Sequence, residues 1–83
     1  MIQKVKKALK LLETKKPDDM LGSDEIMKMG VIVDTKLQPS QFTLYRLIKN
    51  KKLDAINIST GKASRYFVKV KNLKAYLKST YNL

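Results

Sequence analysis

The sequence predicts a small α+β domain in which helices dominate and one β-hairpin precedes the last helix. Its 83 residues are enough for one small domain and too few for two. Apolar residues recur at helical spacing up to about residue 50, and after Leu53 the spacing changes to the alternation typical of strands. The turn-forming segment 60–64, which contains Gly61, separates the two alternating stretches.

The N-terminal segment 1–16 is predicted to form an amphipathic helix. Among its lysines an apolar stripe recurs at helical spacing, formed by Ile2, Val5, Leu9 and Leu12. Pro17 stops such a helix, so residues 17–22 are predicted to link it to a domain over 23–83. The stripe is short for an independent two-helix seam, so we expect it to fold back onto the domain in a monomer. Pairing with the same helix of a second copy, in a dimer, is the alternative.

Two further helices are predicted to follow. Ser23 would cap a short helix over 24–29, which begins with acidic residues and ends at Gly30. The β-branched residues 31–33 are expected to be extended, and 34–38 to form a loop. After Pro39 a third helix begins at Ser40, with an apolar stripe formed by Leu44, Leu47 and Ile48.

Two strands and a last helix complete the prediction. Ile56 and Ile58 alternate with polar residues before the turn. After it, Tyr66, Val68 and Val70 alternate in the same way. Asn72 would then cap a helix whose inner face is formed by Leu73, Tyr76 and Leu77.

The charge of the chain predicts an anionic partner. The formal net charge is +11, far above what solubility requires. Residues 36–83 hold 11 of the 18 lysines and arginines but only one of the seven acidic residues, Asp54. We therefore expect the binding surface in this half of the chain. A general lysine bias of the source is the simpler alternative, but it would not by itself remove the acidic residues from one half.

Composition also excludes several classes of function. The chain has no His and no Cys, so it lacks the commonest general base, thiol nucleophiles and zinc ligands. We expect no enzymatic activity, no cofactor and no metal. The longest uninterrupted apolar run is Val31–Val33, and residues 1–12 lack the features of a signal peptide, so we expect a cytoplasmic protein.

The predicted short helix, basic helix and hairpin with a basic tip form the layout of a winged helix-turn-helix, here with an extra N-terminal helix. Within residues 40–77, a Ser-x-x-Thr-hydrophobic-Tyr-Arg helix is followed by a basic residue, a Leu, a short strand, a Gly turn, an Arg-Tyr strand and a Leu-rich helix. The matching residues are Ser40, Thr43, Leu44, Tyr45, Arg46, Leu47, Ile48, Leu53, Ala55, Ile58, Gly61, Arg65, Tyr66, Leu73 and Leu77. This run resembles the DNA-binding domains of the excisionase and MerR superfamily.

The resemblance implies sequence-specific binding of double-stranded DNA without chemistry, as a recombination directionality factor or a small repressor of a mobile element. A recombinase or a replication protein is the second class of partner that this interpretation allows. A helix in the major groove presents mainly its N-terminal turns to base edges. The predicted contacts are therefore Ser40, Gln41 and Thr43 to bases, Arg46 and Lys49 to bases or phosphates, and Tyr45 to a phosphate. Alternatively, Ser40 and Thr43 only cap the helix and Tyr45 packs against the hairpin.

The tip of the hairpin is the second predicted contact. Lys62, Ser64 and Arg65 surround the Gly turn, and such a tip can lie along the DNA backbone or enter the minor groove. The resemblance places Arg65 at a phosphate-contacting position. A charged tip that is only solvated is the simpler alternative.

Three other functions are compatible with a basic chain of this kind. The first is low-specificity architectural or replication-associated binding of DNA. The second is a protein-interaction or RNA-associated module. Few aromatic residues are expected at the surface beyond Phe67, which argues against binding of single-stranded RNA. The third is membrane attachment through residues 1–12, whose apolar face is short and lacks Trp. We expect no membrane partner.

Overall fold

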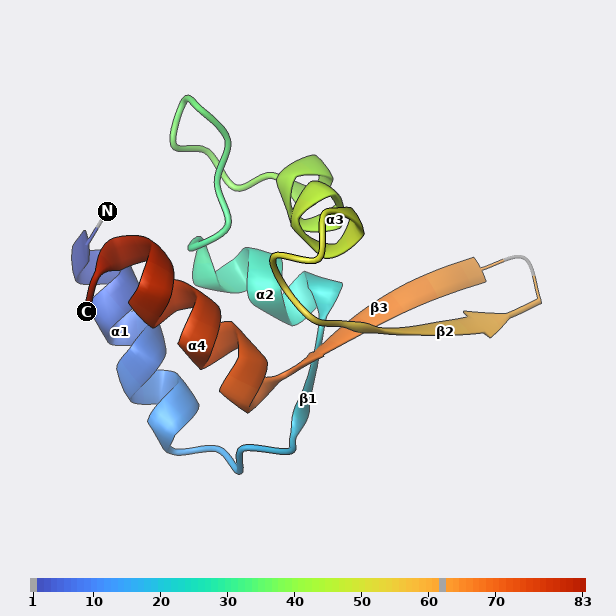
Figure 1. The fold of residues 1–83 in the computed structure, drawn as a ribbon, viewed down its shortest axis with the longest axis horizontal. Coiled ribbons are helices and arrows are strands. Elements are labelled where there is room, and N and C mark those ends of the chain that lie inside the picture. Colours follow the sequence, from blue (N-terminus) through green and yellow to red (C-terminus); the bar gives the residue numbers. More distant parts are fainter. Residues whose placement is uncertain (1, 62) are drawn as a thin grey trace.

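The computed structural model describes residues 2–61 and 63–83, and for residues 59, 60, 63 and 64 it describes only the backbone. Within this part of the chain, four helices and a three-stranded antiparallel sheet form a small α+β domain (Figure 1). The elements follow in the order α1 (Ile2–Glu13), β1 (Met20–Gly22), α2 (Ser23–Met29), α3 (Gln41–Lys49), β2 (Ile56–Thr60), β3 (Ala63–Lys69) and α4 (Val70–Tyr81).

Helix α1 packs against α4 and completes the core. Val5, Leu9 and Leu12 are buried in one cluster with Leu73 and Leu77 of α4. The apolar stripe therefore folds back onto the domain, as its shortness predicted. Ile2, which the sequence pattern placed in this stripe, is instead 45% exposed, because it lies in the first turn beyond the packed part of the helix.

A third strand stands where the sequence analysis placed only a linker. Residues 20–22 form β1, which pairs antiparallel with β3, and the strand order is β1-β3-β2. Leu21 lies opposite Val68, and both side chains are buried. Three residues are too few to show a period, so the sequence pattern predicted a two-stranded hairpin where the structure has three strands.

Strand β3 leads directly into α4, and Asn72 lies inside this helix rather than at its N-cap. The first backbone N–H groups of α4 have partners from the segment after α1. Val70 donates to the carbonyl of Asp19 at 2.9 Å, and Lys71 donates to the carbonyl of Pro17 at 3.1 Å. Backbone carbonyls therefore replace the side-chain cap that the sequence predicted.

Helix α2 also begins without the predicted cap. Gly22 is its N-cap residue, and Ser23 is already helical. Its end is as predicted, because Gly30 adopts a left-handed conformation with φ of 69° and donates to the carbonyl of Met27.

The connection from α2 to α3 is long and is held together by hydrogen bonds within it. Val31 and Ile32 are buried in the core, and Val33 forms an isolated β-bridge with Pro39. One carboxylate oxygen of Asp34 accepts hydrogen bonds from the backbone N–H groups of Lys36 and Gln38, at 2.9 and 3.1 Å. The predicted loop over 34–38 is thus confirmed, and beyond it the backbone N–H of Ser40 donates to the carbonyl of Ile32 at 3.1 Å.

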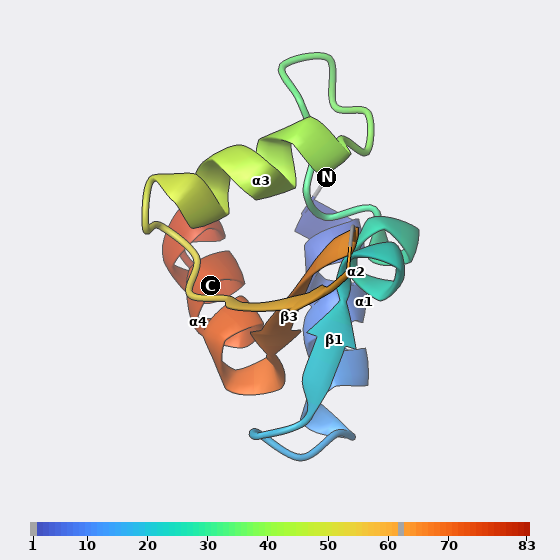
Figure 2. The ribbon, with the colours of Figure 1, turned by 90° about the vertical axis from the view of Figure 1, so that its right-hand side faces the viewer.

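The two views agree that α3 lies on one side of the core, with α1 and α4 on another (Figures 1 and 2). In Figure 1 the β2–β3 hairpin extends away from the helices. Tyr66 and Val68 belong to the inner face of β3, where Val68 is buried. Ile56 and Ile58 belong to the other face, where they are 39% and 43% exposed. Their alternation is as predicted, but they lie outside the core.

Candidate nucleic-acid interface

The outer face of α3 combines aromatic and basic side chains. Leu44 is fully buried, so the helix turns the opposite face to solvent. The exposed residues recur at steps of three and four and therefore share this face: Phe42, Tyr45, Arg46 and Lys49. We call these four residues the α3 face.

The N-terminus of α3 is held by a side-chain cap. Ser40 has extended backbone angles, and its hydroxyl oxygen accepts a hydrogen bond from the backbone N–H of Thr43 at 3.2 Å. The capping role that the sequence allowed is thus present. Gln41 is exposed and Thr43 half-buried, and the 100° step per residue places them on opposite flanks of the α3 face.

An aromatic contact joins α3 to the hairpin. The ring centroids of Tyr45 and Tyr66 are 5.4 Å apart, with an angle of 47° between the ring planes. This is the packing against the hairpin that the sequence analysis held as the alternative for Tyr45. Tyr45 is still 40% exposed, so its side chain remains accessible from solvent. The contact links α3 to β3.

Phe42 is the most exposed large apolar residue of this face, and the sequence analysis did not select it. It is 70% exposed, and the guanidinium carbon of Arg46 lies 6.0 Å from its ring centroid. This distance is at the outer limit of a cation–π contact. The signal that could have revealed it is a large apolar residue on the polar side of an amphipathic helix. Exposed aromatic residues are therefore not confined to Phe67, which is itself half-buried.

The residues at the hairpin tip are the second predicted contact, which the structure describes only in part. Arg65 is exposed, but it alternates with Tyr66 along β3 and so belongs to the opposite face of the sheet. It lines a hollow together with Asp24 and Glu25 of α2, and Tyr66 lines the same hollow. Lys62 lies outside the described residues, and of Ser64 only the backbone is described.

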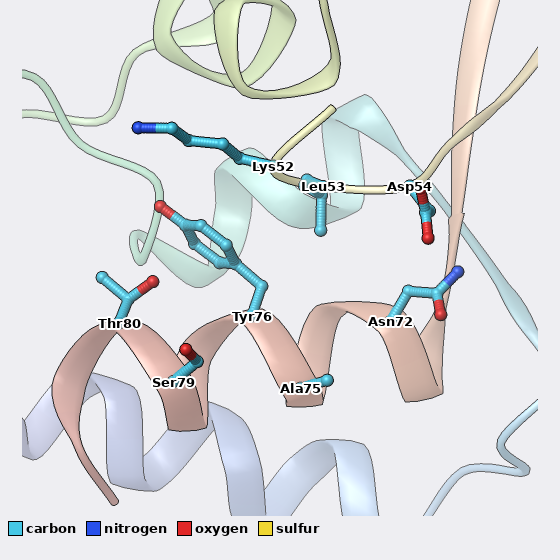
Figure 3. Close-up of a pocket in the computed structure, with 8 residues that line it drawn as sticks. All are labelled: Lys52, Leu53, Asp54, Asn72, Ala75, Tyr76, Ser79 and Thr80. Atoms are coloured by element: carbon cyan, nitrogen blue, oxygen red, sulfur yellow. The ribbon is translucent and has the colours of Figure 1, made fainter. Parts of the chain in front are cut away.

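The connection from α3 to β2 borders a separate hollow of about 430 Å³ on α4 (Figure 3). Lys52 and Asp54 line it from the connection, and Asn72, Tyr76 and Ser79 line it from the helix. It holds one carboxylate, one ammonium group and several hydroxyl and amide groups, which can form hydrogen bonds with a ligand. Sequence reasoning did not predict this hollow, because it is formed by residues from two separate segments.

One described tyrosine has a shifted pKa. Burial raises the pKa of Tyr81 above its usual value, and neighbouring Tyr76 adds to the effect. Tyr81 belongs to α4, so the shift does not concern the α3 face. In the described part of the chain, no group of three or more acidic residues could hold a metal ion. None of the helices described is long and apolar enough to cross a membrane.

No family model, curated protein or solved structure matches the chain. The resemblance to the excisionase and MerR superfamily therefore stays a prediction.

Proposed function

We propose that the chain is a winged helix-turn-helix domain that binds double-stranded DNA sequence-specifically. Helix α3 would enter the major groove, and the β2–β3 hairpin would lie along the neighbouring backbone. The observation that carries the proposal is the α3 face, whose aromatic and basic side chains stand opposite the buried Leu44. An α-helix fits the major groove, and arginine and phenylalanine can read guanine edges and thymine methyl groups there.

Two further features support this proposal. The order of helix, strand, helix, helix and hairpin is the layout of winged helix-turn-helix domains, and β1 closes the sheet beside β3. The Tyr45–Tyr66 contact joins the helix and the hairpin, so that both would approach DNA as one surface. The connection of residues 30–40 is longer than the short turn of a simple helix-turn-helix, but its internal hydrogen bonds restrain it.

The biological role that fits is that of a recombination directionality factor or a small repressor of a mobile element, as the resemblance implies. Gln41 and Thr43 flank the α3 face and remain candidate base contacts. Low-specificity duplex binding is the second candidate, and one observation favours it: lysines are spread over α1 as well as over the last half of the chain.

Selection of bound duplexes from a random pool tests the proposal. Sequence-specific binding predicts a recovered motif, which the protein binds more tightly than a scrambled duplex of equal length. A matched pair of variants then locates the reading surface. Arg46→Gln should abolish most of the preference, whereas Lys28→Gln, which removes one exposed charge from α2, should retain it. Binding without any recovered motif would support the low-specificity function, and absence of binding would exclude both.

A further inference from the structure

The helices α1 and α4 form a second basic surface, away from the α3 face. Two hollows lie along this helix pair. One, of about 530 Å³, lies against α1 and reaches Leu83; it is lined by three lysines, Lys6, Lys7 and Lys10. The other, of about 290 Å³, lies where the end of α1 meets the start of α4; four lysines line it, Lys15, Lys71, Lys74 and Lys78. We call these seven residues the lysine seam.

Local structure explains why these charges gather. The apolar stripe of α1 is buried, which turns its lysines outward. In α4, Lys71, Lys74 and Lys78 recur at steps of three and four and so share one face of the helix. The backbone hydrogen bonds from α4 to Pro17 and Asp19 hold the end of α1 beside them. The charge distribution predicts the anion-binding surface within residues 36–83, whereas α1 and the segment after it supply more than half of the seam.

The seam has few acidic residues to balance it. Glu13 lines the first hollow. Asp18 lies 3.4 Å from the ammonium of Lys71 and 3.9 Å from that of Lys69, with its side chain 77% exposed. Such exposed pairs are weak, and the other lysines of the seam repel one another. This arrangement favours a polyanion that neutralises several of them together.

The two basic surfaces point in different directions. In Figures 1 and 2, α3 lies on one side of the core, and α1 and α4 lie on another. In Figure 3, α1 runs along the side of α4 away from the hollow that borders the α3–β2 connection. A duplex bound at the α3 face would therefore leave the lysine seam open.

We propose that the lysine seam binds the phosphate backbone of a second DNA segment, so that one copy of the chain bridges two duplexes. This inference rests on the proposed function, which supplies the first duplex. The α1 helix is about 18 Å long at 1.5 Å per residue, a length over which one DNA strand presents about five phosphates. Lysine suits this task, because it is a flexible point charge that contacts phosphates without reading sequence.

A protein partner or a membrane fits the lysine seam less well than a DNA backbone does. Centres of protein interfaces are rich in aromatic residues and arginine and poor in lysine. The described residues that line the two hollows include neither an arginine nor an aromatic residue. Membrane attachment through residues 1–12 needs a free apolar face, and Val5, Leu9 and Leu12 are buried in the core.

A bridging assay tests the inference on the full chain. One duplex is fixed to beads, a second fluorescent duplex of unrelated sequence is added with the protein, and the fluorescence retained is measured. Affinity for a single duplex is measured separately by anisotropy. The seam variant is Lys74→Gln/Lys78→Gln. Its matched control is Lys4→Gln/Lys28→Gln, which removes the same charge from exposed lysines outside the seam.

The wild type and the control should retain the fluorescent duplex. The seam variant should retain about tenfold less, while its affinity for a single duplex changes by less than about twofold. Tight binding of one duplex without bridging would overturn the inference and leave the proposed function intact, whereas absence of any duplex binding would overturn the proposed function. Bridging that survives in the seam variant, or is lost equally in the control, would also overturn the inference. So would displacement of the second duplex by poly-glutamate at equal charge, because that result would indicate an acidic protein partner.

Discussion

Among the residues of the α3 face, Phe42 offers the most direct test of the proposed base recognition. Its ring is 70% exposed in the first turn of α3, beside the Arg46 guanidinium. In the major groove the apolar group available to such a ring is the methyl of thymine. If the proposed docking is right, Phe42→Ala should lower the preference for the selected duplex by about 1–3 kcal/mol.

Uracil provides the control for this prediction, because it differs from thymine in DNA only by that methyl group. Replacing the contacted thymine by uracil should weaken the wild type and leave the Phe42→Ala variant unaffected. Competition binding with the two duplexes measures both effects. An equal loss in the wild type and the variant would show that Phe42 does not touch the methyl group.

Ser40 has two competing roles, which stability and specificity measurements separate. Because its hydroxyl accepts the hydrogen bond from the Thr43 N–H, Ser40→Ala should lower the free energy of unfolding by about 1 kcal/mol. Ser40→Gly should lower the free energy of unfolding by only about a few tenths of a kcal/mol, because glycine is a tolerated N-cap residue. Urea denaturation of both variants measures the difference. Unchanged stability together with a relaxed DNA preference would identify Ser40 as a base contact instead.

At the scale of the elements, α1 is an integral part of the fold. Leu12 is fully buried against the core, whereas its neighbour Leu11 is 50% exposed. Leu12→Ala should therefore lower the free energy of unfolding by about 2–5 kcal/mol. Leu11→Ala is the matched control and should change it by less than about 0.5 kcal/mol. Thermal unfolding of each variant measures the change in stability, and a mass measurement in solution gives its oligomeric state. Equal, small effects would mean that α1 does not pack on the domain in solution.

Sequence reasoning predicted the helices with long apolar periods and missed the features that depend on distant partners. The stripes of α1 and α3 follow from spacing alone, as does the left-handed Gly30 that ends α2. Strand β1 has three residues, and only its pairing with β3 makes it a strand. The start of α4 depends on carbonyl groups about 50 residues earlier in the chain, which no local signal around Asn72 reveals.

The candidate site was predictable to a similar extent. The exposed positions of Tyr45, Arg46 and Lys49 follow from the burial of Leu44 across the helix. Arg65 was predicted as a separate contact at the hairpin tip, and alternation alone does not tell which face of a hairpin meets the neighbouring helix. The contact between Tyr45 and Tyr66 decides this, and it joins residues of different elements.

The whole molecule should respond strongly to salt when it binds DNA. The chain has a net charge of +11, and in the proposed complex contacts to about four to six phosphates at the α3 face and hairpin would release condensed counterions. The logarithm of the binding constant should therefore fall against the logarithm of salt concentration with a slope of roughly −4 to −5. Titration of a fluorescent duplex at several salt concentrations measures this slope. A flat response would rule out binding through the phosphate backbone.

Amide spectra of the labelled protein, recorded while the selected duplex is added to one equivalent and then in excess, test the central claim most directly. The claim is that α3 and the β2–β3 hairpin form the surface that recognises DNA. The largest chemical-shift changes should fall in residues 41–49 and in β2 and β3, with smaller changes in α1 and α4 that grow only when duplex is in excess. Changes at one equivalent that are confined to α1 and α4, with α3 unaffected, would contradict the account.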